Sequence, residues 1–286
     1  MIKIQFLKDK YGKEQLVDCF NIAEIAGQTF SLKELHASNF YEIYFFFDGG
    51  GSVYLEAEKL DITAPAILMV PPLQPRKWSL KGKPDCMMVI FEGDFMEAFL
   101  KDTTFLNRLY LFNSTEVPPL LPATVHEMTA YQQVVNSMQQ EVRKHAGDSL
   151  HLLRAYLYQL LILLNRSYIA YYQLKEGLYN NQEMLRFKAF IQQHIREKQT
   201  VKEYAALLQI TRNRLTQLCQ EFFGKDAQTI IHNELLKSCK NELLLTNKTI
   251  AEISYEYNFS APSNFIRFFK NATKVSPTAY RKEYAK

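Results

Sequence analysis

Hydrogen-bonding side chains recur in two segments of the sequence, at the three- and four-residue spacing that places residues on one face of a helix. In the first segment these residues are Arg212, Asn213, Thr216, Gln217 and Gln220. In the second they are Ser263, Asn264, Arg267 and Lys270. Hydroxyl, amide and guanidinium groups present donors and acceptors that match the edges of base pairs in a DNA major groove. Both segments therefore predict base recognition, with an ordinary solvated helix face as the alternative.

The sequence around the first segment predicts two short helices. Thr200 and Glu203 have the spacing of a capping box, in which each side chain bonds the other residue's backbone amide, so a helix is expected over 201–208. Thr211 can cap a second helix, and Gly224 can supply the left-handed residue that ends it. Apolar residues at core spacing occupy another face, namely Leu215, Leu218, Cys219 and Phe222. Two short helices joined by a turn form a helix-turn-helix.

The same pattern recurs around the second segment. Thr249 and Glu252 form another capping box before a short helix over 253–257, and Ser260 can cap a further helix over 262–272. The residues expected to face the core are Phe265, Phe268 and Phe269. Two such units in one chain are a more specific signal than one. The sequence therefore predicts an all-α region with two helix-turn-helix subdomains.

A long motif lies in and around the second unit. It consists of Ile250-Ala251-Glu252-Ile253, Phe259-Ser260-Ala261-Pro262-Ser263, Phe265, Arg267-Phe268-Phe269-Lys270, Ser276-Pro277 and Tyr280-Arg281. These residues resemble the signature of the AraC/XylS-type transcription regulators, and the resemblance extends over roughly 184–282. The chain departs from the family pattern at four positions. Asn258 and Lys274 stand where glycine is usual, Ser254 where alanine is usual, and Ala227 where the first unit commonly has proline. Asparagine tolerates left-handed backbone geometry, whereas Lys274 would be strained by it.

The resemblance implies a function and assigns residues to it. In that family a long helix, here about 228–245, joins two subdomains whose recognition helices enter adjacent major grooves, which lie about 34 Å apart. The base-reading candidates are Asn213, Thr216, Gln217, Ser263, Asn264 and Arg267. Flanking or phosphate contacts are assigned to Arg212, Gln220 and Lys270. The expected protein is a sequence-specific transcription factor that binds double-stranded DNA, is not an enzyme, uses no cofactor, and contacts RNA polymerase if it is an activator.

The N-terminal part reads differently. Short apolar and aromatic runs over 20–91 predict strands, and a helical period over 124–174, broken near 146–148, predicts two helices. Similar regulators often carry a cupin-like β-barrel followed by a helical pair that dimerises. The fold class expected is therefore α+β with two domains. Its parts are a cupin-like regulatory domain over 1–122, a helical hairpin over 123–174, a linker over 175–181 and a DNA-binding domain over 182–286.

A leucine-rich face lies on the second helix of this hairpin. Its residues are Leu153, Leu157, Leu160 and Leu164. Such a stripe is typical of packing inside a domain, but two copies of a regulator on paired sites multiply affinity. Given the resemblance, we assign this face to a homodimer interface.

The predicted barrel lacks the residues of a metal site, and its aromatic residues allow two interpretations. A metal-dependent cupin enzyme needs clustered ligands, yet His36 is the only histidine over 20–100, so we expect no metal site. Aromatic residues could line a small-molecule effector site or equally fill a closed core; they are Tyr41, Tyr44, Phe46, Tyr54 and Trp78. The alternative function is a small-molecule-binding cupin-like protein with a degenerate DNA-binding domain, and a cupin enzyme fused to helices comes last.

Composition agrees with this division. The net charge of the chain is +4, but it is unevenly distributed. The residues after Tyr179 include 17 basic and 10 acidic residues, whereas those up to Tyr179 include 17 basic and 20 acidic residues. A basic C-terminal part suits contact with phosphates. The four cysteines show no metal-binding spacing, and no apolar stretch suggests a signal peptide or a membrane span. We therefore expect a cytoplasmic protein without a membrane segment.

Overall fold

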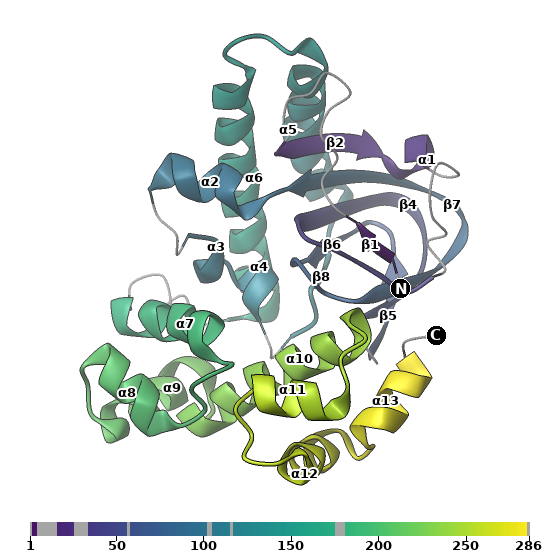
Figure 1. Ribbon diagram of the computed structural model, residues 1–286. Helices are drawn as coiled ribbons and strands as arrows, with labels where there is room; N and C mark the ends of the chain where they lie inside the picture. The colour runs from purple at the N-terminus through teal and green to yellow at the C-terminus, as the bar shows by residue number, and fades with distance from the viewer. Residues whose placement is uncertain are drawn as a thin grey trace. The chain divides into compact units, whose positions relative to one another are not determined.

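The computed structural model describes residues 2–4, 16–25, 34–55, 58–101, 105–114, 117–174 and 181–284. The chain divides into two compact units, one over Ile2–Leu174 and one that contains Lys175–Lys286. The first contains the sheet and the second is helical (Figure 1). The predicted linker over 175–181 lies outside the described residues, apart from Asn181.

The first unit is built on one eight-stranded sheet. Its strands are β1 (Ile2–Ile4), β2 (Val17–Asn21), β3 (His36–Ser38), β4 (Tyr41–Leu55), β5 (Glu58–Thr63), β6 (Ala66–Val70), β7 (Arg76–Phe91) and β8 (Leu120–Pro122). The strand order is β1-β3-β7-β4-β6-β8, with β2 paired to β7 and β5 paired to β4. No pairing joins β1 to β8 among the described residues, so hydrogen bonds do not close the predicted barrel there.

The long antiparallel pair of β4 and β7 forms the centre of this sheet and bends at a glycine run. The register between the two strands shifts on either side of Asp48. A Cβ atom on Gly50 would lie 2.3 Å from the Ile62 carbonyl oxygen, and one on Gly51 would lie 2.5 Å from that of Ser79. Only glycine allows this close approach of strands, which explains the run in the middle of an apolar strand.

The curved sheet buries side chains on both faces. Tyr44, Phe46 and Trp78 belong to the inner core, whereas Phe45 on the opposite face contacts Tyr131 of α5 (Val125–Lys144). Tyr54 is exposed. Of the five aromatic residues considered for an effector site, three thus belong to the buried core. Burial on both faces also accounts for the continuous apolar run in β4.

Helices complete the first unit. They are α1 (Ile22–Ile25), α2 (Gly93–Leu100), α3 (Phe105–Arg108), α4 (Tyr110–Asn113), α5 and α6 (Ser149–Tyr172). The last two pack against each other, and α5 also packs on β2. In the described part of the chain, no helix has both the length and the apolar character needed to cross a membrane.

The leucines assigned to a dimer interface lie inside this unit. Leu153 is 4% exposed, and Leu157, Leu160 and Leu164 are fully buried in the chain's own fold. They cannot contact a second chain, so the assignment was wrong for these four residues. The reason is that α6 packs against α5, α4 and α2 of the same unit, which uses its regular leucine face internally.

A polar cluster is enclosed among the strands. Arg76 on β7 and Glu42 on β4 form a fully buried ion pair, and Glu42 also accepts a 2.8 Å hydrogen bond from the Tyr44 hydroxyl. Ser38 accepts a hydrogen bond from Arg76 at 3.3 Å. His36, buried beside this cluster, has its pKa lowered to about 4 by desolvation and by the positive charge of Arg76.

The second unit consists of seven helices in the described residues. They are α7 (Gln182–His194), α8 (Val201–Leu208), α9 (Arg212–Phe223), α10 (Ala227–Leu245), α11 (Ile250–Glu256), α12 (Pro262–Thr273) and α13 (Pro277–Tyr284). Helix α10 packs against α7, α8 and α9 and also against α11 and α13. We call α8 with α9 the first helix pair and α11 with α12 the second. Helix α10 is therefore the element that both helix pairs share.

The state of His36 predicts acid sensitivity of the first unit. The unfolded chain binds a proton at this imidazole below about pH 6.5, whereas the folded chain does so only near pH 4, so lowering the pH favours unfolding. Between pH 7 and pH 5 this group is expected to remove about 2 kcal/mol from the free energy of unfolding. Urea titrations followed by fluorescence of Trp78, the only tryptophan, measure it. In His36→Asn the pH dependence should shrink by that amount; an equal dependence in both proteins would contradict the assignment.

Candidate nucleic-acid interface

Both short helix pairs begin with the capping boxes predicted from the sequence. The Thr200 hydroxyl accepts from the Glu203 amide at 3.4 Å, and the Glu203 carboxylate accepts from the Thr200 amide at 3.0 Å. Thr249 and Glu252 make the same pair of bonds at 3.1 and 2.6 Å. The amide and hydroxyl of Thr249 lower the pKa of Glu252, because they stabilise its charged form. These bonds fix where α8 and α11 begin.

Helix α9 presents the first predicted polar face. Thr211 caps it by accepting a 3.1 Å hydrogen bond from the Arg214 amide, and Gly224 ends it in the left-handed region. The buried residues are Leu215, Leu218 and Cys219. The exposed residues among those predicted are Arg212, Asn213, Gln217 and Gln220, and Thr216 is half-buried. The Gln220 side chain donates to the Gly224 carbonyl at 3.2 Å, so its amide group is partly engaged within the chain.

Helix α12 presents the second polar face. Phe265 and Phe269 are buried beneath it, and the side chain of Phe268 is half-buried against Phe259 and His232. Ser263, Arg267 and Lys270 are exposed, and Asn264 is half-buried. Ser263, Arg267 and Lys270 thus lie away from the buried phenylalanines, as the sequence predicted, whereas Asn264 lies at the edge of this face.

A chain of hydrogen bonds orients Arg267. The Asn264 side-chain amide donates to the Ser260 hydroxyl at 2.7 Å, and its oxygen accepts from the Arg267 guanidinium at 3.0 Å. Ser260 was predicted as the cap of α12, but Ala261 holds that position and makes no side-chain cap bond. Ser260 instead supports Asn264. The four-residue step from Ser260 to Asn264 was the signal for this contact.

The departures from the family pattern have definite local geometries. Asn258 and Lys274 have φ values of 55° and 67°, so both adopt the left-handed conformation expected where glycine is usual. Asn258 also donates from its side chain to the Glu197 carbonyl at 3.1 Å. Ser254 is buried, and its hydroxyl has no hydrogen-bond partner among the residues that the structure describes. Ala227 is buried at the first position of α10.

The two helix pairs share α10 through an unusual buried stripe. Its residues are Ala227, Ile231, Leu235, Cys239 and Leu243, and Glu242 and Leu244 are also buried beside its end. They recur strictly every four residues, and because four residues turn an α-helix by about 400°, the stripe advances by about 40° at each step. It therefore turns by about 160° along the helix. Near its start Gln228 donates to the Gln199 carbonyl, and near its end the Leu243 carbonyl accepts from Arg281.

Comparison with known proteins places residues 204–283 in a helix-turn-helix domain family. An uncharacterized HTH-type transcriptional regulator of Staphylococcus aureus strain MSSA476 is 25% identical over 110 residues, which are 38% of this chain and 15% of that protein. The chain thus spans only a small part of that relative's length.

Solved structures resemble parts or most of the chain at low identity. The C-terminal domain of AraT, a response regulator from Geobacillus stearothermophilus, is 23% identical, covers 36% of this chain and 86% of that one, and has a TM-score of 0.35. ToxT from Vibrio cholerae is 14% identical, covers 94% of this chain and 97% of that one, and has a TM-score of 0.44.

The ends of α9 and α12 give a matched stability test. Both helices end on a left-handed residue, but α9 ends on Gly224 (φ 63°) and α12 on Lys274 (φ 67°). Because a side chain costs about 1 kcal/mol there, Lys274→Gly should stabilise the unit by up to about 1 kcal/mol and Gly224→Ala should destabilise it similarly. A Cβ on Gly224 meets no atom within 4 Å, so the effect comes from the backbone.

Hydrogen exchange of the amides in α9 and α12 measures both effects locally. The exchange rates of slowly exchanging amides should fall in Lys274→Gly and rise in Gly224→Ala. Changes of the same sign in the two variants would show that the left-handed conformation does not decide these helix ends.

Proposed function

Because the C-terminal part of the chain carries an AraC-type helix-turn-helix domain, we propose that the protein is a transcription factor that reads specific DNA sequences with α9 and α12. The observation that carries the proposal is the polar face of α12. There an arginine is exposed on the surface and held in direction by Asn264, above a buried layer of phenylalanines. A guanidinium held in this way is prepared for bidentate contact with guanine.

The two helix pairs are proposed to act as two helix-turn-helix units. Each has a capping box, a short first helix, a turn and a second helix with an exposed polar face. The second helices would enter successive major grooves, which are about 34 Å apart on one side of the duplex. Asn213, Thr216 and Gln217 are the proposed base-reading residues of α9, and Ser263, Asn264 and Arg267 those of α12.

Residues at the edges of these faces are proposed to contact phosphates. Arg212, at the first position of α9, and Lys270, in the last turn of α12, are exposed cations. Gln220 would be a neutral flanking contact. Phosphate contacts fix the position of the protein on DNA without reading sequence.

The first unit is proposed to regulate DNA binding. We propose that a small-molecule effector binds at the inner core of the sheet, because two buried N–H groups there, Arg76 Nε and Trp78 Nε1, have no hydrogen-bond partner among the described residues. Homodimerisation and, for an activator, contact with RNA polymerase stay predictions. Since the leucine face of α6 is buried, pairing through this helix would use exposed residues such as Leu150, Tyr158 and Tyr171.

Substitution of Arg267 separates base reading from phosphate attraction. Selection of random duplexes by the full-length protein gives the preferred site, and binding is then titrated on that site and on a scrambled one. Arg267→Ala should lose about 1 to 3 kcal/mol of discrimination between the two, which is roughly 5- to 150-fold. The matched variant Lys270→Ala should weaken binding to both duplexes and reduce the salt dependence by about one phosphate contact.

Two outcomes would contradict the proposal. If the wild-type protein selects no motif and binds all duplexes with the same steep salt dependence, the domain does not read sequence. If Arg267→Ala retains full preference for the selected site, the base contact belongs to another residue.

A further inference from the structure

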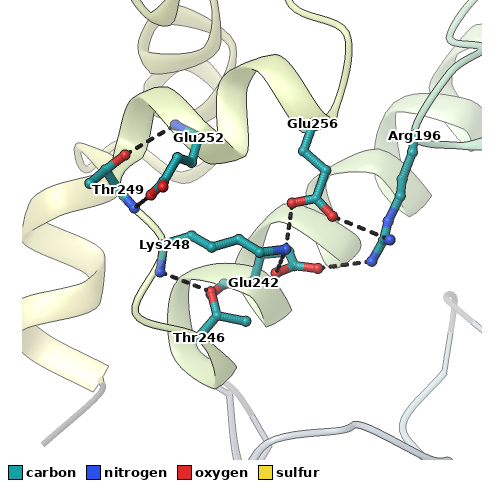
Figure 2. A network of polar contacts seen from close by, with 7 residues as sticks. All are labelled: Arg196, Glu242, Thr246, Lys248, Thr249, Glu252 and Glu256. Carbon is teal, nitrogen blue, oxygen red and sulfur yellow. Dashed lines mark hydrogen bonds and ion pairs between the residues drawn. The ribbon is translucent and has the colours of Figure 1, made fainter.

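Four charged residues form a closed network between the two helix pairs (Figure 2). Arg196 follows α7 in the link to α8, Glu242 lies on α10, Lys248 lies between α10 and α11, and Glu256 is the last residue of α11. Arg196 is distant in sequence from the other three, which all lie between positions 242 and 256. Arg196 precedes the first helix pair, whereas Lys248 and Glu256 belong to the second.

Each cation in this network contacts both carboxylates. Arg196 lies 3.0 Å from Glu242 and 3.2 Å from Glu256. Lys248 lies 3.0 Å from Glu242 and also bonds Glu256. The side chains of Glu242 and Glu256 are only 11% and 24% exposed. Partly buried ion pairs are screened less by solvent and salt than exposed ones. In this closed network each side chain that is ordered makes two ion pairs rather than one.

The backbone around the network holds Lys248 in place. The Thr246 hydroxyl donates to the Glu242 carbonyl at 2.7 Å and accepts from the Lys248 amide at 3.3 Å. The hydrogen bond to Glu256 raises the pKa of Lys248, so the lysine stays charged. The segment after α10 is thus fixed before α11 begins.

Further contacts connect the same two segments. The Gln199 side chain donates to the Tyr257 carbonyl, and Asn258 donates to the Glu197 carbonyl at 3.1 Å. The Arg196 guanidinium lies 5.8 Å from the centre of the Tyr257 ring. The link before α8 therefore contacts the turn that leads from α11 into α12.

The contacts of Arg196 with Glu256, of Gln199 with Tyr257 and of Asn258 with Glu197 join the helix pairs by a second route that does not pass through α10. With α10 alone, a small bend or twist of one helix would turn α12 relative to α9. With a second connection between the link 195–200 and the end of α11, such a turn requires breaking ion pairs and hydrogen bonds. The relative orientation of α9 and α12 is consequently fixed at two places.

We infer that Arg196, Glu242, Lys248 and Glu256 are positioning residues that determine which spacing between two DNA half-sites the protein accepts. The inference rests on the proposed function. One added base pair moves the second half-site by about 3.4 Å along the duplex and about 34° around it. A rigid pair of recognition helices cannot follow this displacement, whereas a loosened pair can.

The experiment compares binding of the full-length protein to its selected site and to the same site with one base pair inserted or deleted between the half-sites. The readout is the ratio of affinities for native and altered spacing in one protein preparation. Loss of active protein cancels in this ratio, so partial unfolding of a variant does not imitate the effect. The wild-type ratio is expected to be at least about tenfold.

The variants test the network and not ion pairs in general. Glu256→Gln removes the ion pair with Arg196 that connects the helix pairs, and Lys248→Met removes the cation that holds Glu242 and Glu256 beside each other. Each should lower the spacing ratio by at least about fivefold. The matched control is Glu183→Gln, which removes a 3.1 Å ion pair with Arg214 inside the first half of the same unit. It should leave the spacing ratio unchanged within about twofold.

The outcomes distinguish this inference from the proposed function. A wild-type protein that selects no motif overturns both. A wild-type protein that selects a motif but tolerates altered spacing, or retention of the full ratio in both Glu256→Gln and Lys248→Met, overturns the inference alone. A fall of the ratio in these two variants, with the control unchanged, supports it.

Discussion

The helical unit depends on the buried stripe of α10. A stripe that recurred at alternating three- and four-residue steps would stay on one side of the helix. By recurring every four residues from Ala227 to Leu243, it turns gradually around the axis. One helix can then contribute to the cores of two helix pairs, and the apolar contacts that stabilise each pair also define how the pairs are joined.

Much of this unit could be predicted from local sequence, because local rules govern its parts. The capping boxes at Thr200 and Thr249 act over three residues, and their bonds are present as expected. The left-handed conformations at Asn258 and Lys274 follow from positions where a helix or turn must end. The division of α9 and α12 into buried and exposed faces follows from helix periodicity alone.

Other features depend on contacts that sequence spacing does not express. The network of Arg196, Glu242, Lys248 and Glu256 unites residues from separate segments, and no periodicity marks them. The leucine face of α6 shows the complementary difficulty. The spacing of its leucines correctly indicates a buried surface. Spacing alone cannot show whether that surface packs against the same chain or against a second one, and here it packs against the same chain. The bend of β4 is signalled by its glycines, while the path of the curved sheet is not.

The four cysteines of the chain are all buried, two in each unit. Burial raises the pKa of the Cys219 thiol to about 12, and it also raises those of Cys86 and Cys239. Since the thiolate is the form that reacts, these side chains will be slow targets for maleimide reagents at neutral pH. A cysteine introduced on an exposed helix face would therefore be labelled selectively in the otherwise unaltered chain. Pairs of such sites would allow dyes or spin labels to report how far the two helix pairs move apart in solution.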